Sequence, residues 1–243
     1  MIEIRNLSKR YGALTAVNDI SFSVGAGQVL GFLGPNGAGK STTMKMITGF
    51  LTPSAGSVSV CGHDVETHPL AAKACMGYLP EGAPSYGEMT VRGFLEFIAD
   101  IRGLPADKRR TRLDDVIARL QLGGVLEQMI ETLSKGFKRR VGLAQALIHD
   151  PLVLILDEPT DGLDPNQKHQ VRELISTMAT DKIIVISTHI LEEVDAVCNR
   201  AIIIANGKLL ADDTPKALAA RAPSGRLDDV FREITTAPTA KVA

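Results

Sequence analysis

One glycine-rich segment constrains this chain more than any other feature. Residues 34–41 read Gly34-Pro35-Asn36-Gly37-Ala38-Gly39-Lys40-Ser41, which fits the pattern G-x-x-x-x-G-K-[ST]. An apolar run at 29–33 precedes the segment, and a helical pattern at about 41–50 follows it. A strand, a glycine loop and a helix in this order bring backbone N–H groups and a helix dipole to one point, where they bind phosphate.

The side chains of this loop indicate which phosphates it binds. We expect Lys40 to pair with the β- and γ-phosphates of a nucleotide and Ser41 to offer its hydroxyl to Mg²⁺. The alternative is a chance glycine turn, but the strand before the loop and the helix after it favour phosphate binding. The expected nucleotide-binding residues are Gly34, Pro35, Asn36, Gly37, Ala38, Gly39, Lys40, Ser41 and Thr42.

Acidic and histidine side chains follow two apolar runs further along the chain. Asp157 and Glu158 end the run at 152–156, so we expect both carboxylates at the C-terminal edge of a sheet, where such sheets bind ligands. Asp157 would hold Mg²⁺, directly or through water, and Glu158 would be the general base for an attacking water. His189 ends the next apolar strand, which predicts contact with the γ-phosphate. The alternatives are acidic turn residues and a structural histidine.

The alternation of patterns predicts an α/β fold with an inserted helical segment. Short strands fill the first 30 residues, and apolar runs at 152–156, 183–186 and 201–205 are typical of a mainly parallel sheet covered on both faces. Between 90 and 148, apolar residues recur at helical spacing instead. We expect one domain, with a nucleotide-binding core at 1–81 and 149–210, a helical subdomain at 82–148 and a short helical extension at 211–243.

The charge, the cysteines and the apolar runs of the chain indicate which partners and which cellular compartment to expect. The formal net charge is −1, which gives no support for a nucleic-acid partner. We expect the basic cluster Lys138-Arg139-Arg140 to form a solvated or ion-paired helix face. The three cysteines are scattered and suit a reducing cytosol. Because no apolar run approaches the ~20 residues of a spanning helix, we expect any link to a membrane to come through a partner.

The motifs taken together identify a family. The segment Leu133-Ser134-Lys135-Gly136-Phe137 stands one turn before an expected helix. With the phosphate loop, Asp157-Glu158, the turn at 161–164 and His189, it resembles the ATP-binding subunits of ABC transporters. The resemblance covers nearly the whole chain, and the motifs occur in the order found in the family.

This resemblance implies a fold and an activity. The fold would be a P-loop NTPase core with an N-terminal antiparallel β subdomain and the inserted helical subdomain. The activity would be hydrolysis of ATP with Mg²⁺, and Tyr11 resembles the aromatic residue that stacks on adenine in the family.

It also implies partners. The resemblance implies a head-to-tail homodimer of such subunits. In this dimer each ATP would lie between one phosphate loop and Ser134, Lys135 and Gly136 of the other subunit. Asp164 would lie on the turn that communicates across that interface. Ser134, Gly136 and the following helix start also form an anion site on physical grounds. A separate transmembrane permease would hold the dimer at the cytoplasmic, inner face of the cell membrane.

Three residues depart from the family pattern. Lys135 and Phe137 replace the third and fifth residues of the usual Leu-Ser-Gly-Gly-Gln. Lys135 either brings positive charge near the γ-phosphate or faces solvent, and the sequence leaves both open. Glu81 replaces the usual Gln and could accept from water or touch Mg²⁺. Beyond it, Tyr86 and Met89 either contact the permease or cover the core of the helical subdomain.

The functional hypotheses differ in what the ATPase drives. Residues 78–81, 133–137 and 227–231 resemble the ABC-2 export type, and among its members the ATPase subunit associated with bacterial gliding motility. We therefore expect a subunit that powers a separate export permease. The alternative is a soluble ABC ATPase that is not coupled to transport. Such proteins resemble two cassettes in tandem or a cassette split by a long coiled coil, whereas this chain has one cassette. A non-enzymatic nucleotide switch would need a failed catalytic site, which the full set of motifs argues against.

Overall fold

A six-stranded sheet forms the centre of the molecule. The computed structural model describes residues 1–83 and 85–236. The strand order is β10-β9-β3-β8-β7-β6, and all neighbours are parallel except β9 and β10. The strands are β3 (Val29–Leu33), β6 (Met76–Leu79), β7 (Val153–Asp157), β8 (Ile183–Thr188), β9 (Arg200–Ala205) and β10 (Lys208–Asp213). This arrangement confirms the expected α/β fold with a mainly parallel sheet.

A smaller antiparallel sheet stands beside the central one. Its order is β2-β1-β4-β5, and all its pairings are antiparallel. The strands are β1 (Ile2–Tyr11), β2 (Leu14–Val24), β4 (Ala55–Val60) and β5 (His63–Asp64). Gly12, at φ 57°, makes the turn between β1 and β2, a conformation that glycine adopts at little cost. The N-terminal antiparallel subdomain is therefore confirmed.

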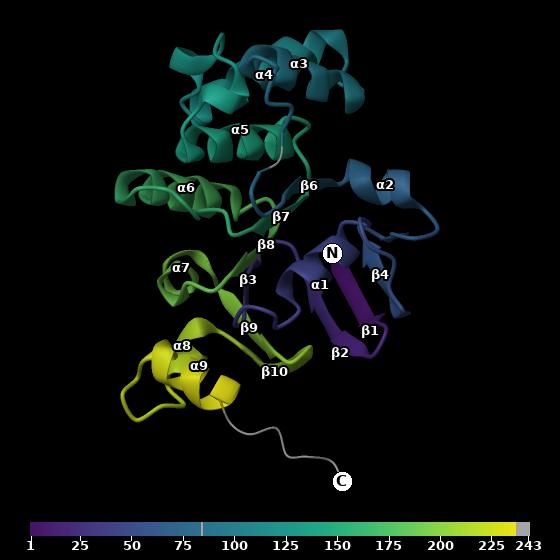
Figure 1. The fold of residues 1–243 in the computed structure, drawn as a ribbon, viewed down its shortest axis with the longest axis vertical. Helices are drawn as coiled ribbons and strands as arrows, with labels where there is room; N and C mark the ends of the chain where they lie inside the picture. The colour runs from purple at the N-terminus through teal and green to yellow at the C-terminus, as the bar shows by residue number, and fades with distance from the viewer. Residues whose placement is uncertain (84, 237–243) are drawn as a thin grey trace.

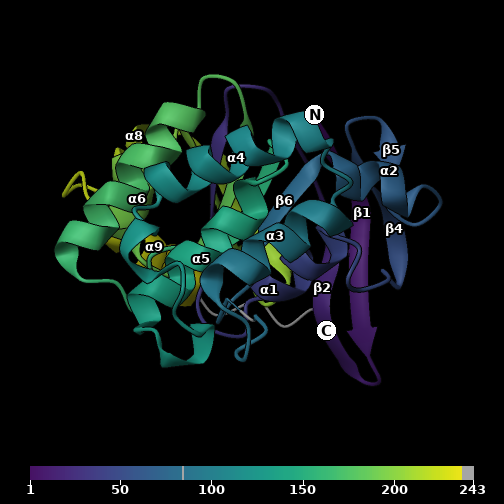
Figure 2. The same ribbon diagram turned by 90° about the horizontal axis from the view of Figure 1, so that it is seen from above.

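Helices cover the central sheet in layers. They are α1 (Lys40–Ile47), α2 (Pro69–Ala74), α3 (Val91–Ile101), α4 (Ala106–Arg119), α5 (Lys135–Leu147), α6 (Pro165–Met178), α7 (Leu191–Val197), α8 (Pro215–Ala219) and α9 (Leu227–Thr236). Two short 3₁₀ turns, Gly123–Val125 and Ile130–Thr132, lie between α4 and α5. Figure 1 shows α3, α4 and α5 stacked at one end of the molecule and α8 and α9 at the other. Seen from above in Figure 2, the antiparallel strands lie to one side of the helical layers.

The strands of the central sheet divide their side chains between two cores. Along β7, Val153 and Ile155 pack with α1 and the antiparallel sheet, whereas Leu154 and Leu156 pack with the helices α3 to α6. This alternation follows from the two-residue period of a strand. All five residues of β7 are buried, which explains why the sequence shows a continuous apolar run. A third cluster joins α7, α8 and α9 to the sheet.

Capping residues set the start of the helical subdomain. Thr90 caps α3, because its hydroxyl accepts a hydrogen bond from the amide of Gly93 at 3.1 Å. Gly103 at φ 64° follows the last turn of α3. Val91, Phe94 and Leu95 are buried on one face, in agreement with their helical spacing.

The structure moves some expected boundaries. Strand β10 runs to Asp213, so the end of the core that we expected at residue 210 falls inside a strand. The expected helical extension then consists of α8 and α9, and its residues 237–243 lie outside the described part of the chain. Among the described helices, none combines the length and the apolar character that crossing a bilayer requires.

Candidate active site

The phosphate loop joins β3 to α1 at the carboxyl edge of the central sheet. A Cβ at Gly34 would collide with the carbonyl oxygen of Ile204, and one at Gly39 would lie 2.5 Å from the carbonyl oxygen of Ala16. Gly39 also adopts φ 107°. Because a side chain would clash at both positions, the loop backbone can approach its neighbours closely only with glycine there.

Lys40 is folded into this loop. Its side chain is buried, and its ammonium donates hydrogen bonds to the carbonyl oxygens of Gly34 at 2.6 Å and Pro35 at 3.1 Å. Burial lowers the pKa of Lys40, while the negative charges of Glu158, Asp157 and Glu81 oppose that change. The cation is therefore held at the centre of the expected site, surrounded by the carboxylates that the sequence singled out.

Asp157 is a buried carboxylate whose two oxygens lack a hydrogen-bond partner among the described residues. Burial raises its pKa, and Glu81 adds to the rise; the hydroxyls of Ser187 and Ser41 and the charge of Lys40 oppose it. A buried, unpaired carboxylate costs free energy unless a cation or donor satisfies it. Asp157 and the Ser41 hydroxyl are hard oxygen donors of the kind Mg²⁺ prefers, so the residues present fit that ion.

Few protein groups surround this position. Within the ranges 1–83 and 85–236, no cluster of three or more His, Cys, Asp or Glu residues is arranged to hold a metal ion. Mg²⁺ commonly takes one or two protein oxygens and completes its shell with phosphate and water.

Glu158 and His189 contact each other at the ends of neighbouring strands. The Nδ1 atom of His189 lies 2.9 Å from Oε1 of Glu158, and the two residues follow β7 and β8, which are parallel neighbours. Glu158 adopts φ 52°, and its amide donates to the carbonyl oxygen of Ser187 at 2.8 Å. If Nδ1 donates to the carboxylate, Nε2 of the half-exposed imidazole is left to contact another group.

Glu81 and Tyr11 both lie at the surface. Glu81 is exposed just beyond β6, and its charge acts on Lys40, Asp157 and Tyr78. It is therefore part of the same electrostatic environment as the phosphate loop. Tyr11 ends β1 with its ring 49% exposed, and the ammonium of Lys9 lies 5.4 Å from the ring centre. An exposed ring of this kind is accessible for stacking.

The segment expected to act in trans caps α5. Ser134 is the N-cap, with its hydroxyl accepting from the amide of Phe137 at 3.3 Å. Gly136 is buried so closely against Gln167 of α6 that a Cβ would collide with its amide oxygen. Lys135 is exposed, and its aliphatic stem passes over Gly162. Within the described part of the chain, no hydrogen bond or ion pair joins this segment to the phosphate loop.

Asp164 lies close to the same segment. It caps α6, and its carboxylate accepts from the amide of Gln167 at 2.9 Å. Gln167 therefore touches both Gly136 and Asp164, and it joins the two elements that the family resemblance assigns to the dimer interface. The sequence carried no signal for Gln167, because its role depends on the packing of α5 against α6.

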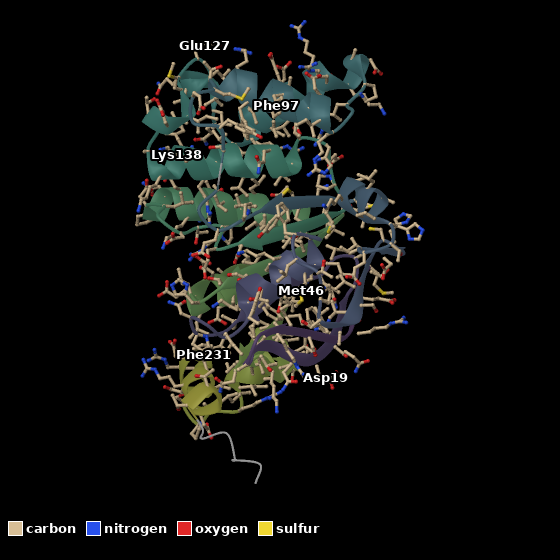
Figure 3. The ribbon with its side chains drawn as sticks, turned by 45° about the vertical axis from the view of Figure 1, so that its right-hand side comes forward. Asp19, Met46, Phe97, Glu127, Lys138 and Phe231 are labelled. Atoms are coloured by element: carbon tan, nitrogen blue, oxygen red, sulfur yellow. The ribbon has the colours of Figure 1, made fainter. Side chains whose placement is uncertain are left out.

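The basic cluster is not a solvated face, and that expectation was wrong for two of its members. Arg139 and Arg140 are only 4% and 8% exposed. Arg139 donates to the carbonyl oxygens of Asp157 at 2.7 Å and Pro80 at 3.2 Å, and Arg140 donates to Gln170 at 2.8 Å. Both point toward the sheet side of α5, where main-chain and amide oxygens replace water. Figure 3 shows Lys138 on α5, between the helical layer that carries Phe97 and the central sheet.

Comparisons with known proteins agree with this geometry. The family described as "ABC transporter" matches residues 17–161. The Nod factor export ATP-binding protein I of Burkholderia orbicola is 41% identical over 218 residues, covering 89% of this chain and 72% of the relative. The protein of the same name from Ralstonia nicotianae is 38% identical over 219 residues, covering 90% and 68%.

Solved structures give the same result. A structure described as the ATP-binding subunit of an ABC transporter superposes with a TM-score of 0.89 at 30% identity, covering 96% of this chain and 99% of that one. The cbiO1 protein of Clostridium perfringens, described as part of the ABC transporter complex cbiONQ, gives 0.79 at 28% identity, with 90% of each chain covered. With its phosphate loop, its buried Asp157 and its Glu158–His189 pair, this chain belongs to the ABC transporter family, as an ATP-binding subunit that hydrolyses ATP.

Proposed function

We propose that this chain binds ATP with Mg²⁺ and hydrolyses it to power export through a separate membrane permease. The observation that carries the catalytic part is the contact of 2.9 Å between His189 and Glu158, beside a phosphate loop whose Lys40 is already held in place. Mg²⁺, when bound, would neutralise charge on the β- and γ-phosphates. Ser41 and Asp157 are the residues we assign to hold it, with Glu81 at its periphery.

The proposed chemistry is in-line attack of water on the γ-phosphate. Glu158 accepts the proton of the attacking water, and His189 contacts the transferred phosphate through Nε2. Lys40 leaves the loop carbonyls and pairs with the β- and γ-phosphates. Most of the catalysis comes from positioning and charge stabilisation, since phosphoryl transfer offers the protein little covalent work.

The proposed assembly is a head-to-tail dimer of this chain. Ser134, Lys135 and Gly136 would complete the ATP site of the partner subunit, and Asp164 would lie beside them. The N-terminus of α5 offers unpaired backbone donors and a favourable dipole for the γ-phosphate. The exposed ammonium of Lys135 and its position over Gly162 favour a charge at the edge of that interface.

An exposed apolar patch supports a membrane partner. Phe50, Leu70 and Ile101 are 73%, 85% and 64% exposed, and all three line one groove between α1, α2 and α3. Exposed apolar side chains gathered in a groove commonly mark an interaction site. We assign this groove to a cytoplasmic segment of the permease, which would place the chain at the inner face of the membrane.

The loop beyond Glu81 gives a second candidate for that contact. Met89 packs against the core of the helical subdomain, which favours the structural alternative for this residue. Tyr86 is 56% exposed although its ring meets Phe94 and Phe97 edge-on. We therefore propose Tyr86 as a permease contact and assign Met89 to the core.

The direction of transport is inferred from two sources. The segments at 78–81, 133–137 and 227–231 resemble the ABC-2 export type, including the subunit associated with gliding motility. The relatives from Burkholderia and Ralstonia carry the word "export" in their names. Both sources favour export. We propose the ABC-2 subtype on the basis of the three sequence segments alone.

The test uses a candidate permease that is co-expressed with this chain. Cells expressing the chain alone and cells expressing both proteins are fractionated, and phosphate release is measured in each fraction. We expect the ATPase to move to the membrane fraction only with the permease, and Glu158→Gln to abolish phosphate release in both. An active ATPase that stays in the soluble fraction when the permease is co-expressed would instead support the uncoupled alternative.

A further inference from the structure

A buried carboxylate lies behind the catalytic pair. Glu193 of α7 is 2% exposed, and its Oε2 lies 2.8 Å from the hydroxyl oxygen of Thr188. Its second oxygen, Oε1, has no hydrogen-bond partner among the residues that the structure describes. A carboxylate is seldom buried in this way unless it is neutral, paired or needed for function.

The hydroxyl of Thr188 connects this carboxylate to the proposed general base. Thr188 is fully buried at the end of β8. Its oxygen accepts a hydrogen bond from the amide of Ile190 at 3.1 Å and lies 3.4 Å from Oε2 of Glu158. His189 contacts the other oxygen of Glu158. The carboxylate of Glu158 is thus flanked by two neighbouring residues of one strand end.

The number of hydrogens decides how this network is arranged. Thr188 has one hydroxyl hydrogen and two carboxyl groups nearby. If Glu193 is ionised, it takes that hydrogen, and Glu158 then faces a lone pair of Thr188. If Glu193 is a neutral acid, it donates to Thr188, and the hydroxyl hydrogen points to Glu158. Only the second arrangement gives both carboxyl oxygens that face Thr188, Oε2 of Glu193 and Oε2 of Glu158, a partner of the right kind.

The surroundings of Glu193 favour the neutral acid. Burial raises the pKa of Glu193, and the charge of Glu158, just beyond the end of β7, adds to the rise, while Arg172 and Lys168 on α6 oppose it. The charge of Glu193 also acts on the thiol of Cys198, just beyond the end of α7, whose pKa burial raises. The hydrogen bond from Thr188 acts in the opposite direction to burial.

We propose that Glu193 is a positioning residue for ATP hydrolysis. As a neutral acid it donates to Thr188 and so directs the Thr188 hydroxyl to Oε2 of Glu158. This contact, opposite the one from His189, holds the carboxylate of Glu158 in one orientation toward the attacking water. The inference rests on the role proposed for Glu158 and extends it to a second layer of residues.

The test compares substitutions at both positions in the purified chain. Glu193→Gln keeps a donor toward Thr188 and should retain kcat within about threefold, whereas Glu193→Ala should lower kcat by about tenfold. KM for ATP should change little, because the phosphate loop is untouched. Thr188→Ser should behave like Glu193→Gln, and Thr188→Val like Glu193→Ala. The double variant Glu193→Ala with Thr188→Val should be no worse than either single change, since both break one path.

Two outcomes would overturn the inference. One is a Glu193→Gln protein that folds normally but loses as much kcat as Glu193→Ala, because an isosteric neutral donor would then not suffice. The other is additive loss in the double variant. If Glu193→Ala does not fold, the pair Thr188→Ser and Thr188→Val decides the question alone, and equal kcat in both refutes it. Glu158→Gln is the reference: full turnover in that variant would refute the proposed function itself.

Discussion

Arg139 of α5 donates a hydrogen bond of 2.7 Å to the main-chain oxygen of Asp157, the residue that ends β7. The same guanidinium donates to the carbonyl oxygens of Pro80 at 3.2 Å and Pro159 at 3.4 Å. One buried side chain therefore ties the helix that begins beside Ser134 to both strand ends that carry acidic site residues.

The first prediction concerns that contact. Arg139→Lys should destabilise the fold by about 2 kcal/mol, because one ammonium cannot reach all three carbonyl oxygens. For a chain of this size the melting temperature should fall by about 4–8 °C. The matched control is Lys138→Gln on the same helix, whose ammonium reaches only one main-chain oxygen and should shift it by less than ~1 °C. Thermal melts of both variants test this: equal melting temperatures for the two variants would mean that the hydrogen bonds of Arg139 do not stabilise the fold.

Glu158→Gln should bind ATP but hydrolyse it about 10²–10⁴-fold more slowly, because the amide cannot take a proton from water. ATP-bound dimers should accumulate, which size-exclusion chromatography with Mg²⁺-ATP would reveal. Glu192→Gln is the control, since Glu192 is exposed at the start of α7. Phosphate release that is normal in Glu158→Gln would remove the general-base role.

The dimer model is tested by mixing two inactive proteins. Lys40→Ala should lose most ATP binding, and Ser134→Arg should bind ATP as a monomer but block dimer closure. In a mixed dimer both lesions fall on one composite site and leave the other whole, so phosphate release should partly recover. Calorimetry on isolated Ser134→Arg is the check: loss of ATP binding there would mean that the segment acts in cis.

The permease groove can be tested without disturbing the fold. Leu70→Gln should leave the ATPase of the isolated subunit unchanged, because the side chain is 85% exposed, but should reduce co-purification with the permease severalfold. Leu14→Gln, also exposed but on β2, is the matched control. Tyr86→Ala should weaken assembly only if the second loop takes part. Wild-type recovery of the complex with Leu70→Gln would exclude this groove.

The local motifs could be predicted because each one is contiguous. The phosphate loop, Asp157, Glu158 and His189 all follow apolar strands of a parallel sheet, and parallel strands bring their carboxyl ends to one edge. The contact between His189 and Glu158 follows from that rule once β7 and β8 pair as neighbours. The sequence therefore suffices for the fold class and for bringing these side chains to one edge of the sheet, while the roles assigned to them stay predictions.

Residues whose role depends on packing could not be found in this way. Arg139 looked like part of a surface charge cluster, because nothing local indicates that three carbonyl oxygens await it inside the fold. Glu193 sits in a short acidic stretch with Glu192, and only the packing of α7 against β8 makes one of the two buried. Gln167 likewise gains its place from α5 lying against α6. Contacts between residues far apart in the chain produce no periodic pattern in the sequence.

The backbone conformation of Glu158 opposes stability and activity to each other at this position. A side chain with a Cβ at φ 52° costs of order 1 kcal/mol, and asparagine tolerates that conformation better than glutamate. Glu158→Asn should therefore melt at or above the temperature of the wild type while its hydrolysis is lost. The proposed general base is thus a residue that the local conformation disfavours, so a substitution that stabilises the chain at this position would lead away from activity.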